Sequence, residues 1–298
     1  MLALVAGTGG LPAALVARLP EKPYICALDG HAPDLSVDLS FRIEHLGTTL
    51  DILRRVGVTR VCFAGAVRRP DVDPRAVDAA TAPLVPRIAQ AIAQGDDGAL
   101  RIIIAIFEER GIKVVAAHDI APDLIPQAGV LTRAKPQAWH EADARAGAAC
   151  VAQIGAADQG QACIVRVGRV EATEDAAGTE AMIAQFYEPY ARRDVIDPLG
   201  YAMDVAGDAL DAVSDWLSGT EEPPLTADDG ILYKAPKPGQ DRRADLPLIG
   251  PDTVMQAAEA GLAGIVIAAG GVMVLDQPTV IEMLDAQGMF LWVREDGS

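Results

Sequence analysis

Basic residues are scarce in this sequence. Its 298 residues include 25 Lys and Arg against 42 Asp and Glu, which gives a formal net charge of -17 at pH 7. Nucleic-acid binding depends on neutralising phosphates and releasing their counterions, so a chain of this charge repels a polyanion overall. We therefore expect no nucleic-acid partner, and any anionic ligand must be small and bound by a local group of cations.

Cysteine pairs and metal-binding spacings are also missing. The four cysteines are scattered, with no spacing typical of a zinc site, at Cys26, Cys62, Cys150 and Cys163. We expect reduced thiols inside strands and helices, as in a cytoplasmic protein.

The sequence lacks a long hydrophobic run and several well-known catalytic motifs. Residues 261–275 are uncharged, but they are fewer than the roughly 20 of a membrane-spanning helix and are interrupted by glycines. The first seven residues lack the positive start of a signal peptide and instead predict a β-strand. No G-x-S-x-G, H-E-x-x-H or P-loop pattern is present, which disfavours the serine hydrolase, zinc protease and P-loop classes.

The chain is long enough, and with 50% hydrophobic residues apolar enough, for two domains. Apolar runs at 2–6, 24–28, 60–64 and 112–116 alternate with helical patterns, including 48–56, 74–94 and 97–110. This alternation predicts a Rossmann-like domain over residues 1–131, with a parallel sheet covered by helices on both faces. A linker near 131–136 then leads to a C-terminal α/β domain over residues 136–298.

A glycine turn follows the first predicted strand. The residues Gly7-Thr8-Gly9-Gly10-Leu11-Pro12 lead into a helix, and their backbone N–H groups can approach a phosphate at its positive end. Tight packing of strand on helix explains the glycines equally well. The full dinucleotide fingerprint would have glycine in place of Pro12.

Other polar residues have both a functional and a structural interpretation. Arg68 and Arg69 follow a predicted parallel strand, where open α/β sheets bind ligands, but surface arginines are common. Asp96 or Asp97 is most simply a helix N-cap, and a ligand contact of either residue is the alternative. Glu171 and Glu174 are close enough in sequence to share Mg²⁺, or both face solvent. Residues 187–228 predict an acidic amphipathic helix.

The segment 232–250 concentrates cations in an otherwise acidic chain. Its prolines and glycines exclude a regular helix. Phosphate-binding cations beside a carboxylate that can hold a metal or orient water are what pyrophosphate chemistry requires, although a solvated loop is the alternative. The charged side chains concerned are Lys234, Lys237, Asp241, Arg242, Arg243 and Asp245.

Several short motifs, weak singly, occur in an order that resembles the LpxI family, the UDP-2,3-diacylglucosamine pyrophosphatases of lipid A biosynthesis. The resemblance spans nearly the whole chain, and its most distinctive part is Lys234-Ala235-Pro236-Lys237-Pro238 followed by Asp245-Leu246-Pro247. The other motifs lie at residues 6–12, 63–70, 95–97, 117–119 and 261–264. The sequence departs from the family pattern at 175–177 and in the length of the acidic segment.

The resemblance implies Mg²⁺-dependent hydrolysis of UDP-2,3-diacylglucosamine to UMP and 2,3-diacylglucosamine 1-phosphate. It implies a homodimer at the cytoplasmic face of the inner membrane, with the ligand between the two domains. Asp245 is then the catalytic residue and a metal ligand together with Glu171 and Glu174. The implied substrate-binding residues are Gly9, Gly10, Leu11, Arg68, Arg69, Asp97, Lys234, Lys237, Gln240 and Arg243. The alternatives are an NAD(P)-dependent oxidoreductase and a non-catalytic binder of nucleotide lipid.

Overall fold

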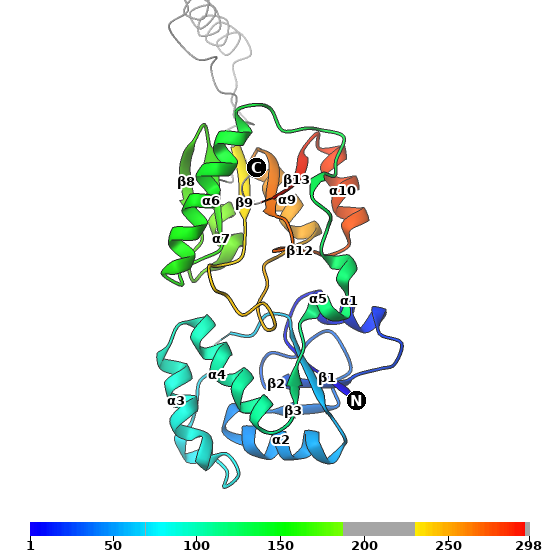
Figure 1. Cartoon of the computed structure of the whole chain (residues 1–298), viewed down its shortest axis with the longest axis vertical. Helices are drawn as coiled ribbons and strands as arrows, with labels where there is room; N and C mark the ends of the chain where they lie inside the picture. The colour runs from blue at the N-terminus through cyan, green and yellow to red at the C-terminus, as the bar shows by residue number, and fades with distance from the viewer. Residues whose placement is uncertain (69, 187–229, 296–298) are drawn as a thin grey trace, which may run out of the picture.

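The computed structural model of the chain describes residues 1–68, 70–186 and 230–295. They form an N-terminal and a C-terminal α/β domain. Figure 1 draws the N-terminal domain below the C-terminal domain. Arg69 and the predicted acidic helix at 187–228 lie outside the described residues.

The N-terminal domain is organised around a parallel sheet. Its strands are β1 (Leu2–Ala6), β2 (Tyr24–Leu28), β3 (Leu39–Phe41), β4 (Arg60–Ala64) and β5 (Lys113–Val114). They follow the order β3-β2-β1-β4-β5, and every neighbouring pair is parallel. The fold class predicted from the alternating pattern is confirmed.

Helices cover both faces of this sheet, because successive side chains of a strand point to opposite faces. Leu2 and Leu4 of β1 pack in one apolar cluster with α1 (Leu11–Arg18) and α5 (Ala117–Ile120). Ala3 and Val5 pack in another with α2 (Leu46–Arg55), α3 (Val85–Ala93) and α4 (Asp96–Glu109).

The region 74–94 differs from the continuous helical pattern predicted for it. Two 3-10 segments, Pro74–Ala76 and Ala82–Leu84, precede α3. Each of the three pieces has a proline in its first turn. Proline fits a helix start but cannot donate a hydrogen bond to the preceding turn, so each one begins a new segment.

The C-terminal domain contains a mixed sheet. Its strands are β6 (Gly129–Val130), β7 (Ala162–Arg166), β8 (Arg169–Thr173), β9 (Gly230–Lys234), β11 (Leu262–Ala268) and β13 (Phe290–Arg294). In the order β6-β13-β11-β9-β7-β8, the three central strands β13, β11 and β9 are parallel and the outer pairings are antiparallel. Strand β6 falls inside the predicted N-terminal domain 1–131, yet it pairs with β13 and so extends the C-terminal sheet.

One long helix, α6 (His140–Ala156), covers one face of the mixed sheet. The other face packs against α7 (Gly178–Ala184), α9 (Pro251–Glu259) and α10 (Gln277–Ala286). No helix in the described parts of the chain is both long and apolar enough to cross a bilayer.

The two domains meet through apolar side chains. Leu246 and Met273 of the C-terminal half share a buried cluster with Leu11 and Leu15 of α1. Met273 lies in β12 (Met273–Val274), which pairs in parallel with β10 (Leu248–Ile249). In Figure 1 the yellow and orange chain between β9 and β10 descends to the N-terminal domain before it returns. The distinctive motif is therefore placed at the junction.

Candidate active site

Residues 235–247 form the loop that connects β9 with β10. The side chain of Gln240 stabilises this loop through hydrogen bonds within it. The Gln240 side chain is buried, with 9% exposed. Its Oε1 accepts a hydrogen bond from the Lys237 backbone N–H at 2.9 Å, and its Nε2 donates to Asp245 Oδ2 at 2.5 Å. One amide thus fixes the position of the Asp245 carboxylate relative to the start of the loop.

Helix α4 of the N-terminal domain holds the same loop from below. Asp97 Oδ1 accepts from the Asp241 backbone N–H at 3.1 Å, and the Arg101 guanidinium donates to the Gly239 carbonyl oxygen. Arg243 donates to Glu108 Oε1 at 2.8 Å and to both carboxylate oxygens of Asp241 at 2.9 and 2.7 Å.

The ion pair between Asp241 and Arg243 also lowers the pKa of the Asp241 carboxyl group. Hydrogen bonds from the Arg243 guanidinium hold the pKa of Asp241 below its usual value, because they favour the charged form. The loop is therefore a charged and hydrogen-bonded structure fixed to both domains. The solvated-loop alternative does not describe it.

The C-terminal end of α6 supports the loop from the other domain. Lys237 Nζ donates to Asp158 Oδ1 at 2.6 Å. A β-carbon added at Gly155 would lie 2.9 Å from Pro238 Cδ, so the absence of a side chain there allows the helix to touch the loop backbone.

Lys234 lies beneath the loop, at the end of β9, with only 7% of the residue exposed. Its ammonium donates to Thr179 Oγ1 at 2.9 Å, and the Thr179 hydroxyl donates to Glu174 Oε1 at 2.5 Å. Glu174 Oε2 accepts from the Gln161 backbone N–H at 2.7 Å. Burial lowers the pKa of Lys234, while the negative charges of Glu174 and Asp245 oppose that change. Asp245 is thus close enough to act on Lys234 through its charge.

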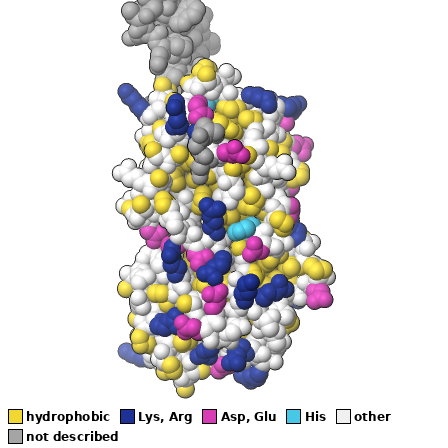
Figure 2. All heavy atoms as spheres, in the orientation of Figure 1, with side chains coloured by type: hydrophobic (Ala, Val, Ile, Leu, Met, Phe, Trp, Pro, Cys, Tyr) yellow, Lys and Arg dark blue, Asp and Glu magenta, His cyan; other side chains and the backbone are white. Residues whose placement is uncertain are grey.

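The glycine turn lies at the carboxyl edge of the N-terminal sheet, just before Leu11, which packs in one cluster with Leu246 of the loop. Thr8 and Ala66 exchange backbone hydrogen bonds of 2.9 Å, which joins the turn after β1 to the loop after β4. Gly9 has φ of 93°, a conformation that favours glycine, and Gly10 is the N-cap of α1. Arg68 is exposed just beyond the bridge. Figure 2 shows Lys and Arg side chains gathered with acidic groups and a histidine where the domains meet.

The predicted residues Gln240 and Asp245 are bonded to each other in the loop, and Lys234 lies close enough for the Asp245 charge to act on it. Leu11 packs in the same cluster as Leu246, which directly follows Asp245. Asp97 is not the N-cap of α4, since Gly95 occupies that position and Asp97 contacts the loop instead.

The predicted acidic pair separates. Glu171 is exposed on β8 and lies 3.8 Å from Arg166, whereas Glu174 is buried with both oxygens bonded inside the protein. Within the described residues, no three His, Cys, Asp or Glu side chains gather around one point that could hold a metal ion.

The carboxylates at the junction are compatible with Mg²⁺ in one arrangement, in which the substrate supplies part of the ligands. Mg²⁺ commonly binds through one or two carboxylates together with substrate phosphates and water. Asp245 is the half-buried carboxylate at the junction, and Gln240 occupies one of its oxygens. In the described part of the chain, the residues present are therefore compatible with an ion held by Asp245 together with a bound pyrophosphate. They do not supply a complete set of protein ligands.

Several residues of the site had no signal in the sequence. Thr179, Asp158 and Glu108 contact the loop or Lys234 from positions 55, 79 and 135 residues away from their partners. Such contacts depend on the packing of the sheet and helices, and no local spacing predicts them.

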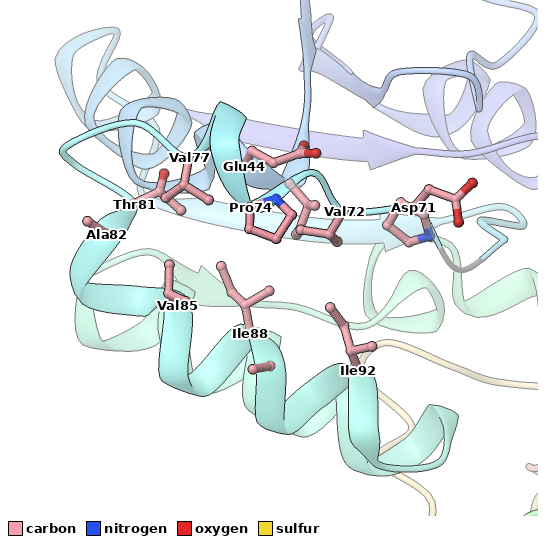
Figure 3. A pocket seen from close by; sticks show the side chains of 13 residues that line it. Glu44, Asp71, Val72, Pro74, Val77, Thr81, Ala82, Val85, Ile88 and Ile92 are labelled. Carbon is pink, nitrogen blue, oxygen red and sulfur yellow. The ribbon is translucent and has the colours of Figure 1, made fainter.

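A separate groove of about 820 Å³ lies in the N-terminal domain. In Figure 3, Val85, Ile88 and Ile92 of α3 point toward the segment that includes Val72 and Val77. None of the described residues predicted for the site lines this groove, so it is not part of the loop site.

Comparisons with known proteins cover both domains. Family models described as the LpxI N-terminal domain and the LpxI C-terminal domain match residues 1–124 and 127–292. The UDP-2,3-diacylglucosamine pyrophosphatase LpxI of Caulobacter vibrioides is 33% identical over 303 residues, which covers 97% of this chain and 96% of that protein. The two family matches meet just before β6, in agreement with its pairing in the C-terminal sheet.

Proposed function

The chain belongs to the LpxI family, and from this premise we propose that it hydrolyses UDP-2,3-diacylglucosamine to UMP and 2,3-diacylglucosamine 1-phosphate. The observation that supports the proposal is the Asp245 carboxylate, fixed by Gln240 in a loop that contacts both domains. The side chain of Lys234, buried at the end of β9 and bonded to Thr179, is the amine that meets an anionic substrate in this proposal.

Hydrolysis adds one water across the P–O–P bridge. The water oxygen bonds to one phosphorus, the bridging oxygen leaves with the other phosphate, and the water proton is taken up by a base or by solvent. Negative charge grows on the departing phosphate, so a fixed cation stabilises the transition state more than the ground state. Lys234 is suited to this role, and Asp245 to orienting the water or holding the metal.

We propose Mg²⁺ as the cofactor, held by Asp245 together with the substrate phosphates. Such an ion neutralises phosphate charge and polarises the P–O bonds when it is bound. Glu171 and Glu174 have internal partners, which favours a small protein contribution to the metal site.

The experiment is UMP release from UDP-2,3-diacylglucosamine, with Mg²⁺ and with EDTA. Asp245→Asn keeps the shape of the side chain and removes its charge, and we expect UMP release to fall by about 100-fold or more while UDP-lipid binding persists. Asp252→Asn is the control, because Asp252 is an exposed acid in the first turn of α9. Undiminished release by Asp245→Asn, or release unaffected by EDTA, would refute the corresponding part of the proposal.

We also propose a homodimer that works at the cytoplasmic surface of the inner membrane, where a two-chain lipid resides. Sedimentation velocity tests the dimer. Co-sedimentation with vesicles that contain the substrate lipid, compared with vesicles that lack it, tests the membrane contact. Because the chain has a net charge of -17, we expect the contact to depend on the substrate and not on anionic lipid.

A further inference from the structure

The Lys234 ammonium has unused hydrogen-bonding capacity. An ammonium group has three N–H donors. In the described part of the chain, the bond to Thr179 Oγ1 is the one hydrogen bond that Lys234 Nζ donates. The residue is only 7% exposed, so water has little access to the two remaining donors. A buried charged donor without acceptors is costly, and such groups mark places where a ligand completes the site.

The Thr179 hydroxyl determines where this ammonium lies. It accepts from Lys234 and donates to Glu174 Oε1, so its single proton is committed to the carboxylate. Glu174 in turn is fixed by the Gln161 backbone N–H. A lysine side chain has four rotatable bonds and a point charge, and without such a partner its position would be poorly defined.

The Glu174 oxygens that hold the Thr179 hydroxyl and the Gln161 N–H cannot at the same time bind a metal ion. Both of its oxygens accept hydrogen bonds from the protein, and the residue is 8% exposed. The backbone approaches closely here, because a β-carbon at Gly160 would collide with the Glu174 carbonyl. The carboxylate is therefore held at the end of the β7–β8 hairpin and pointed at Thr179.

Resting on the proposed function, we propose that Glu174 and Thr179 are positioning residues that aim the Lys234 ammonium at the substrate pyrophosphate. The ammonium then offers its two free N–H groups to phosphate oxygens next to Asp245. Glu174 acts through Thr179 and supplies the balancing negative charge, which assigns it a role other than the metal ligation predicted from the sequence.

The test compares Thr179→Val, which removes the hydroxyl at nearly constant shape, with Thr179→Ser, which retains it. For UMP release we expect Thr179→Val to lower kcat by about 10- to 100-fold with KM changed only a few-fold, the usual size of an effect on orientation. Thr179→Ser should recover most of the rate. Thr173→Val is the matched control, because Thr173 is exposed on β8 and valine suits a strand.

Glu174→Gln separates positioning from metal binding. It should lower kcat while the Mg²⁺ concentration for half-maximal rate stays as in the wild type, whereas loss of a metal ligand would raise that concentration. Thermal melting checks that each variant is folded, and Thr179→Ala replaces Thr179→Val if the valine disturbs α7.

The outcomes distinguish the two proposals. An active wild type with undiminished kcat in folded Thr179→Val or Thr179→Ala would overturn the positioning role alone. A raised Mg²⁺ requirement in Glu174→Gln would return Glu174 to the metal site. A pure, folded wild type that releases no UMP would overturn the proposed function and this inference together.

Discussion

The Gln240 side chain bonds at both ends, to the Lys237 backbone and to Asp245 Oδ2. Its amide nitrogen provides the donor that an ionised carboxylate needs. Replacing that nitrogen with oxygen by Gln240→Glu would place two carboxylates within hydrogen-bond distance, where both cannot easily be charged.

We predict that Gln240→Glu lowers the rate of UMP release by about 10-fold or more at neutral pH, because the Asp245 carboxylate is displaced or protonated. Steady-state kinetics measures the effect. Gln159→Glu makes the same chemical change at an exposed position and should leave the rate unchanged. Equal rates in Gln240→Glu and the wild type would show that this hydrogen bond has no part in the reaction.

A second residue-scale prediction concerns Glu44, which is 2% exposed and bonded by Arg42 and by the Asp73 backbone N–H. Hydrogen bonds from Arg42 lower the pKa of Glu44 from the usual 4.5 to about 2. A depressed pKa stabilises the folded state above the unfolded-state value, and this contribution disappears as the pH falls toward 2. Glu44→Gln should therefore cost about 1 kcal/mol at pH 7, discounted for the half-exposed Arg42, and less at pH 3.5.

Urea denaturation at the two pH values measures this difference. A cost that is identical at pH 7 and pH 3.5 would contradict the assigned linkage. Glu259→Gln makes the same chemical change at an exposed position of α9 in the C-terminal domain, and it serves as the comparison.

At the residue scale, the sequence predicts which residues of the 234–245 segment lie near one another better than it predicts the partners around them. Lys234, Gln240 and Asp245 are near one another in the sequence, at the end of β9 and in the loop that follows it. Arg243 and Lys237, which we expect to bind phosphate, are bonded to Asp241 and Asp158 in this structure, and their contact with phosphate stays a prediction. A sequence shows that a cation is present but does not show which carboxylate the fold places beside it.

At the scale of elements, helix α4 of the N-terminal domain holds the 235–247 loop. Asp97 accepts from the Asp241 backbone, and Arg101 reaches Gly239. We predict that Asp97→Ala lowers kcat by about 10-fold with little change in KM, because the loop is less well placed. Asp97→Asn retains an acceptor oxygen and should keep most of the rate.

The control for this contact between α4 and the loop is Asp51→Ala. It removes an ion pair between α2 and Arg110 that does not touch the loop. It should have wild-type kinetics. If Asp97→Ala instead raises KM with kcat unchanged, Asp97 contacts substrate directly, as the family resemblance implies.

Elements formed by local pattern were predictable, and their pairing was not. The strands β1, β2 and β4 have the bounds expected from their apolar runs, since buried parallel strands are continuously hydrophobic. The pairing of β7 with β9 joins strands separated by residues 167–229, and β6 joins β13 across most of the C-terminal half. Pairings of this kind depend on tertiary packing and have no local signature.

At the scale of the whole molecule, Leu246 joins the two domains. It is 9% exposed and belongs to the apolar cluster that includes α1. In the sequence it has the same pattern as a residue buried in its own domain, so two domains were predicted but not this contact. Leu246→Ala should cost about 2 to 3 kcal/mol and weaken the coupling between the domains.

The three tryptophans are at positions 139, 216 and 292, all within the range 136–298 of the C-terminal domain, which is called the C-terminal half below. Tryptophan fluorescence therefore monitors that half, while far-UV circular dichroism monitors both domains. We expect coincident urea curves for the wild type and separate curves for Leu246→Ala. Met255→Ala, at an exposed position of α9, should keep the curves coincident. Coincident curves in Leu246→Ala, shifted only in midpoint, would contradict coupling through this residue.

The contacts of α4 with the loop, through Asp97 and Glu108, also have an evolutionary consequence. The bonding partners belong to two different domains of the chain, so a change on one side leaves a charge uncompensated on the other. We expect Glu108 and Arg243 to covary among relatives, with paired replacements tolerated where single ones are not. Recombination that exchanges one half between distant relatives should then yield well-folded chimaeras with poor activity, and restoring the matching α4 residues should recover it.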